Sequence, residues 1–250
     1  MRKSSCQATI GFPGKGPHCF TLVELLTVMA VMAILVSLIL PGLRDAYRGA
    51  YMAQCVNNAH QITLAWTTYL EDENGFFVNS NPNDPGRPAW VGPGNAPSSL
   101  SLGLMWPYLS DPNAFRCPMD PTDHVRTYSL NGFLGDGVEP HWWSPIGGPR
   151  RALQQLKQTQ VMIVTEENDP RGWNVGSWVG PSTYFRWMWV DPLTSFHWDG
   201  TVHGFVDGSV VRTRWSDYRT LELSDFFVQQ PDNPDWEYCW TIGYDTEPYP

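Results

Sequence analysis

The stretch from Phe20 to Leu40 reads FTLVELLTVMAVMAILVSLIL and decides how the rest of the chain is organised. Its one charged residue is Glu24, and Pro41 follows the stretch directly. About 20 apolar residues at a rise of 1.5 Å each are enough for a helix to cross a bilayer. The sequence therefore predicts one membrane-spanning helix between a short polar leader and a soluble domain.

A secretory signal peptide is the main alternative for this run, and three features argue against it. The apolar region of a signal peptide is shorter, at roughly 7–15 residues, and a small-residue cleavage site follows it. Here Pro41 is followed by Gly-Leu-Arg-Asp. Glu24 lies inside the run, where a lone carboxylate costs about 2.5–3.5 kcal/mol. Because no Lys or Arg lies between Lys15 and Arg44, we expect the partner of Glu24 to lie outside this helix.

The segment HCFTLVELLTVMAVMAILVSLILP resembles the N-terminus of type IV prepilins and of type II secretion pseudopilins. In that family a basic leader is cut just before Phe, Glu is the fifth mature residue, and Pro is common at the twenty-second. The resemblance places the cut between Cys19 and Phe20, and Glu24 and Pro41 at those two positions. One residue departs from the family, because Gly is usual where Cys19 stands.

The resemblance implies how such a chain is processed and used. Prepilin peptidase would cut after Cys19 and N-methylate Phe20. The new amino group would pair with Glu24 of a neighbouring subunit, since a buried pair costs less than a buried single charge. The implied partners are the peptidase, copies of this chain, other pilin-like subunits and the inner-membrane assembly machinery.

Charge and composition limit the cellular locations and the classes of binding partner that fit this chain. The chain has 250 residues and a formal net charge of −9, and the part after the cut carries 13 basic and 25 acidic side chains. This acidity argues against nucleic acid, whose phosphates favour basic patches. The basic leader favours a cytoplasmic N-terminus. The resemblance implies a single-pass protein of the bacterial inner membrane with an extracytoplasmic head.

Three cysteines follow the predicted cut, namely Cys55, Cys117 and Cys239. An oxidising compartment permits a disulfide among them. Similar proteins often carry Cys in the contexts QCVNN and FRCPMD, so the resemblance favours Cys55–Cys117. Cys117–Cys239 and three free thiols stay as alternatives.

The predicted fold is α+β, with a long N-terminal helix over 20–75 that continues past Pro41 into a small, loop-rich, antiparallel-sheet head over 76–250. Residues 1–19 form the leader. After Leu43 the apolar residues recur at spacings of three and four, which indicates one helix face. Asn58 falls on the predicted polar face, and Asn74-Gly75 predicts the helix end.

Two elements of the head have clear signals. QVMIVT, at 160–165, predicts a buried strand. Thr201–Val206 and Ser209–Trp215 predict a hairpin within the segment 197–215, because Asp207-Gly208 between apolar runs favours a tight turn. His197, nine residues, then Asp207 and Gly208 also match the His-X9-Asp-Gly motif of a prepilin-like subgroup. QCVNN resembles a segment of the same subgroup.

Metal binding is a weaker hypothesis with two forms. Imidazole and carboxylate suit zinc, so one candidate set is His197, Asp199, His203 and Asp207. The alternative is that Asp207 shapes the turn and His197 bonds nearby backbone. The resemblance implies calcium as a second form, since related major pseudopilins bind it near the C-terminus. Its candidate ligands are the acids of 119–124 and Asp232, Asp235, Glu237, Asp245 and Glu247.

No feature of the sequence favours an enzyme. Glu166-Glu167 follows the predicted strand, but we expect both acids to be solvated at the strand end. Nucleophile-elbow, Walker and dinucleotide motifs are absent from the sequence. The sequence predicts a pilin-like structural subunit that serves secretion or adhesion. The alternative is a membrane-tethered module that binds glycan through exposed members of its 13 tryptophans.

Overall fold

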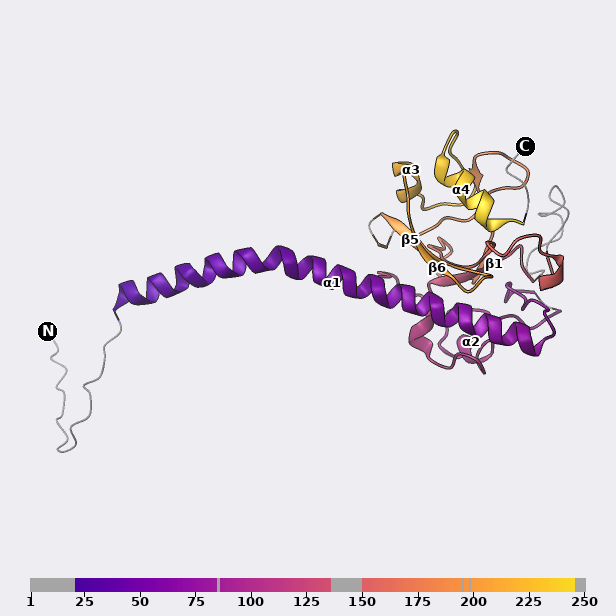
Figure 1. Ribbon diagram of the computed structural model, residues 1–250, viewed down its shortest axis with the longest axis horizontal. Helices are drawn as coiled ribbons and strands as arrows, with labels where there is room; N and C mark the ends of the chain where they lie inside the picture. Colours follow the sequence, from indigo (N-terminus) through magenta and orange to yellow (C-terminus); the bar gives the residue numbers. More distant parts are fainter. Residues whose placement is uncertain (1–20, 85, 136–149, 195, 198, 246–250) are drawn as a thin grey trace, which may run out of the picture. The chain divides into compact units, whose positions relative to one another are not determined.

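Figure 1 shows the computed structural model, which describes residues 21–84, 86–135, 150–194, 196–197 and 199–245. The chain divides into two compact units, Met1–Arg48 and Gly49–Pro250. The second unit, Gly49–Pro250, is called the head. The described elements are α1 (Leu22–Asp72), α2 (Ser98–Ser101), η1 (Pro112–Phe115), β1 (Tyr128–Asn131), η3 (Leu153–Gln155), β2 (Met162–Glu166), β3 (Ser177–Trp178), β4 (Met188–Trp189), β5 (Gly200–Phe205), β6 (Val210–Arg214), α3 (Tyr218–Leu221), β7 (Val228–Gln229) and α4 (Pro234–Gly243).

The long predicted helix is confirmed as α1, which begins at Leu22 and runs through Pro41 to Asp72. Every residue of its first part, 22–50, is exposed. The apolar window in this part is long enough to span a membrane. The helix ends where the sequence predicts, because Asn74 and Gly75 both take positive φ and the Gly75 amide donates to the Leu70 carbonyl at 2.8 Å.

The head is built on a five-stranded sheet in the order β3-β1-β2-β5-β6. The predicted strand and hairpin are confirmed as β2 and as β5 with β6. The sheet is not wholly antiparallel as predicted, because β3 pairs parallel to β1. A second sheet joins β4 and β7. Long helix and small mixed sheet together give the predicted α+β fold, which is compatible with a pilin-like architecture.

The head's part of α1 packs against this sheet. Its buried side chains include Cys55, Ala59, Ile62 and Trp66. Figure 1 shows α4 on the other side of the sheet from α1, and Trp236, Cys239 and Trp240 of α4 are buried. The core therefore forms two layers, one on each face of the sheet.

α1 approaches the sheet closely at Gly204 of β5. A Cβ added there would clash with the Thr63 hydroxyl and lie 2.7 Å from Val164 Cγ1. The absence of a side chain at Gly204 therefore sets the spacing between helix and sheet.

We expect Gly204→Ala to lower the free energy of unfolding by about 1–3 kcal/mol, because overpacking must push α1 away from β5. Urea unfolding of the full chain in detergent, followed by tryptophan fluorescence, measures this. Gly86→Ala is the matched control, since its added Cβ meets only Asp84 Oδ1, at 3.5 Å. Equal stability of the two variants would contradict the packing argument.

Candidate functional site

The start of α1 is capped by Thr21, which directly precedes the helix, and by Glu24 in its first turn. The Glu24 carboxylate accepts hydrogen bonds from the backbone N–H and the hydroxyl of Thr21, both at 2.8 Å. The Glu24 amide donates to Thr21 Oγ1 at 3.2 Å. This reciprocal arrangement is a capping box, which satisfies amides that a helix start leaves unpaired. Cys19 and Phe20, the predicted cleavage site, lie outside the described residues.

The capping box does not test the expected charge partner of Glu24. The sequence predicts that this partner lies outside the helix, and Thr21, which directly precedes α1, supplies hydrogen bonds only. Thr21 is neutral, so these bonds leave the charge of the carboxylate uncompensated. The sequence offers no cation between Lys15 and Arg44. Hydrogen bonding and charge compensation are thus separate questions at Glu24.

In the head, the segments that carry the family resemblance converge on one buried cluster. It consists of Cys55 from α1, Cys117 from the loop after η1, Glu166 from the end of β2 and His197 from the loop before β5. One ligand atom of each lies within 4.8 Å of the others, and all four residues are buried. QCVNN, FRCPMD and the His of His-X9-Asp-Gly therefore meet at a single point, which we call the Cys-His-Glu cluster.

The contacts inside this cluster are close. The sulfur atoms of Cys55 and Cys117 are 2.7 Å apart, and both residues are free thiols. His197 Nε2 lies 3.5 Å from Cys117 Sγ and 2.9 Å from Glu166 Oε1. The structure thus brings together the two cysteines that the resemblance pairs. Cys239, the alternative disulfide partner of Cys117, is buried in α4.

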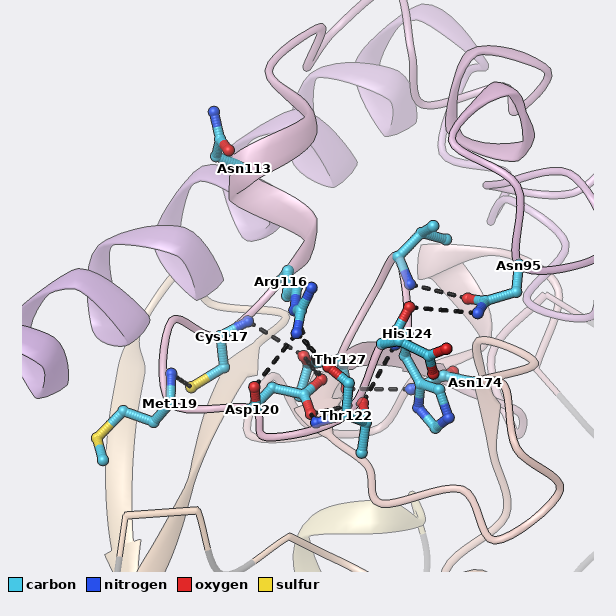
Figure 2. A network of polar contacts seen from close by, with 12 residues as sticks. Asn95, Asn113, Arg116, Cys117, Met119, Asp120, Thr122, His124, Thr127 and Asn174 are labelled. Atoms are coloured by element: carbon cyan, nitrogen blue, oxygen red, sulfur yellow. Dashed lines mark hydrogen bonds and ion pairs between the residues drawn. The ribbon is translucent and has the colours of Figure 1, made fainter.

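The loop that carries Cys117 is held by a polar network (Figure 2). The Asp120 carboxylate accepts hydrogen bonds from the hydroxyls of Thr122 and Thr127, both at 2.6 Å. The Cys117 amide donates to Thr127 Oγ1 at 3.1 Å, and the Met119 amide donates to Cys117 Sγ at 3.4 Å. These bonds fix both the backbone and the sulfur of Cys117.

Asn58 ties the same loop to α1 and corrects the sequence analysis, which places it on a polar face. The side chain is buried, and its amide donates to the carbonyls of Asn113 at 3.2 Å and Arg116 at 2.9 Å. Its neighbour Asn57 is exposed. The periodicity of the helix cannot show that Asn58 is buried, because the carbonyls to which its amide donates lie far away in the sequence.

Burial and close contacts within the cluster shift the pKa values of His197 and Cys117. Burial lowers the pKa of His197, but hydrogen bonds to Cys117 and Glu166 and the charge of Glu166 outweigh it and raise the pKa to about 10. The contact with Cys55 and burial raise the pKa of the Cys117 thiol far above its usual range. The cluster therefore holds a protonated imidazole at His197 and a neutral thiol at Cys117.

Glu166 is the member of the cluster that sequence reasoning missed. We expect it and Glu167 to be solvated, but both are buried. Glu166 accepts from the Val202 amide at 3.0 Å, and Glu167 accepts from the Ser129 hydroxyl at 2.5 Å. The only signal in the sequence is a pair of acids directly after a predicted buried strand. This pattern does not show which element packs over the two side chains.

The metal set proposed from the sequence is dispersed. His203 bonds the Thr165 hydroxyl through Nδ1 at 2.9 Å, and burial lowers its pKa to about 3, which keeps it neutral. Asp199 pairs with Arg212 and Arg214. Asp207 accepts from the Ser209 amide at 2.9 Å, and Gly208 takes φ +84°, so the Asp-Gly pair shapes the turn. Of this set, His197 alone belongs to the cluster.

Three of the calcium candidates, Asp120, Asp235 and Asp245, serve as hydrogen-bond acceptors within the head. Asp235 accepts from the amides of Ser216 and Asp217, both at 2.9 Å. Asp245 accepts from the Lys157 amide at 3.0 Å. Asp120 holds the loop of Cys117, and Glu247 lies outside the described residues. These carboxylates anchor loops of the head.

The tryptophans that the structure describes contribute mainly to the core. Of these ten, Trp66, Trp90, Trp178, Trp189, Trp215, Trp236 and Trp240 are buried, and Trp106, Trp173 and Trp187 are half-buried. An exposed tryptophan for glycan stacking would have to come from Trp142, Trp143 or Trp198, which lie outside the described residues.

Comparisons with known proteins identify no relative. No family model, no curated protein and no solved structure matches this chain.

We expect Asn58→Ala to lower the free energy of unfolding by about 1–3 kcal/mol, because two carbonyls of the Cys117 loop lose their donor. Urea unfolding in detergent measures the loss. The neighbouring exposed residue gives the control, Asn57→Ala, for which we expect a change within about 0.5 kcal/mol. If both variants unfold at the same urea concentration, Asn58 does not hold the loop on α1.

Proposed function

We propose that this chain is a pilin-like or pseudopilin structural subunit that assembles through the first part of α1 into a filament. Prepilin peptidase cleaves it after Cys19 and methylates Phe20. The filament serves type II-like secretion or adhesion. The head lies outside the cytoplasm and has no catalytic role.

The observation that carries the proposal is the exposed apolar surface of residues 22–40. Its large side chains range up to 74% exposed at Leu22 and 72% at Leu38. A surface this apolar needs a non-aqueous environment. A lipid bilayer supplies it for the stored subunit, and the helices of neighbouring subunits supply it in a filament.

Glu24 supports assembly over simple anchoring. A carboxylate in a membrane helix is costly and marks a functional contact. Thr21 satisfies its hydrogen bonding but not its charge. An amino terminus freed at Phe20 of a neighbouring subunit would compensate that charge, and a helix bundle would bring the two groups together.

The capping box allows charge and hydrogen bonding to be tested separately with Glu24→Gln. Glutamine still accepts from Thr21, so the helix start and membrane insertion stay intact. The charge for the amino group is lost, and we expect the filament-to-membrane ratio of the subunit to fall by about tenfold or more, equivalent to about 1.4 kcal/mol. Immunoblots of sheared filaments and membranes measure the ratio.

The control is Glu73→Gln, which removes an exposed acid just after α1. It should leave the ratio unchanged. Assembly of Glu24→Gln at the wild-type level would overturn the pairing between Glu24 and the amino terminus.

A further inference from the structure

The Cys-His-Glu cluster gathers four side chains whose donor atoms suit a soft or borderline metal ion. Two thiols, an imidazole nitrogen and a carboxylate oxygen lie within 4.8 Å of one another in the interior. Each residue comes from a different segment of the chain, and Cys55, Cys117 and His197 are fully buried together with Glu166. Convergence of this kind needs a physical reason, because each polar side chain costs free energy to bury.

Hydrophobic packing alone does not explain why these four polar side chains are buried together. Taking an imidazole, a carboxyl group and two thiols out of water costs free energy that apolar packing does not return. A divalent cation changes this balance, since it binds deprotonated cysteine and neutral histidine and offsets the negative charge. Glu166 and both thiolates would then face a cation.

We propose that Cys55, Cys117, Glu166 and His197 bind a zinc-type divalent ion as a structural site. Sulfur and imidazole donors favour zinc over calcium or magnesium, which prefer oxygen ligands alone. Four protein ligands complete a tetrahedral shell and leave no open position for a substrate. The ion would link α1, the Cys117 loop, β2 and the segment before β5.

Neighbouring groups already orient two of the ligands. The Met119 amide points at Cys117 Sγ at 3.4 Å, which favours a thiolate, and the Val202 amide holds Glu166 Oε2 at 3.0 Å. Cys117, although buried, also lines a surface cavity of about 370 Å³, so the cluster lies close below the surface. Support of the ligands by neighbouring groups is expected of a metal site.

Zinc binding would require the sulfurs of Cys55 and Cys117 to move apart. Two sulfurs on a tetrahedral zinc lie about 3.7 Å apart, from Zn–S bonds of about 2.3 Å. The Cys55 and Cys117 sulfurs are 2.7 Å apart, so side-chain rotation must separate them by about 1 Å. A Cys55–Cys117 disulfide requires the opposite movement. The two states exclude each other, because a disulfide removes both thiolates.

Metal analysis of the full chain, purified in mild detergent with a histidine-free tag, tests the proposal. We expect about one zinc per chain. Cobalt exchanged into the site should give the visible bands of tetrahedral cobalt and thiolate-to-cobalt charge transfer. Alkylation and mass spectrometry without reductant should find Cys55 and Cys117 unlinked.

His197→Ala and Cys117→Ser should abolish zinc retention and the charge-transfer band. Cys239→Ser is the matched control, since Cys239 is equally buried but lies in α4 outside the cluster, and it should keep both. If the cluster variants do not fold, the wild-type measurements decide. A disulfide-linked Cys55–Cys117 peptide, or free thiols that bind neither zinc nor cobalt, would overturn the proposal.

Discussion

The head depends on the close contact between residues 55–70 of α1 and the five-stranded sheet. Gly204 lets the helix approach β5, and Tyr128 of β1 donates its hydroxyl to the Cys55 carbonyl at 3.0 Å. Asn58 then holds the loop that carries Cys117. Because these contacts share one helix face, the position of α1 determines whether the Cys-His-Glu cluster forms at all.

The same helix meets two different physical requirements along its length. Its first part exposes apolar side chains and is long enough to span a membrane, and its last part packs in the head. A single continuous element thus belongs to both units of the chain. In the proposed function this continuity makes the head inseparable from the segment that assembles.

Local patterns predict α1 and its end, β2 and the β5–β6 hairpin, but not the other described strands or α4. The apolar run, Asn74-Gly75, QVMIVT and Asp207-Gly208 each act through neighbouring residues, so the sequence identifies them. Asn58 and Glu166 are wrongly predicted as exposed, because their partners lie 55 and 31 residues away. The cluster could be suspected only in parts, since no spacing rule joins Cys55, Cys117 and His197.

The mature N-terminus tests the central claim most directly. Mass spectrometry of the chain isolated from membranes should find a peptide that begins with N-methylated Phe20. That result would give Glu24 the partner group that assembly requires. An intact leader starting at Met1 would contradict the account, because the amino group proposed to pair with Glu24 would then be absent.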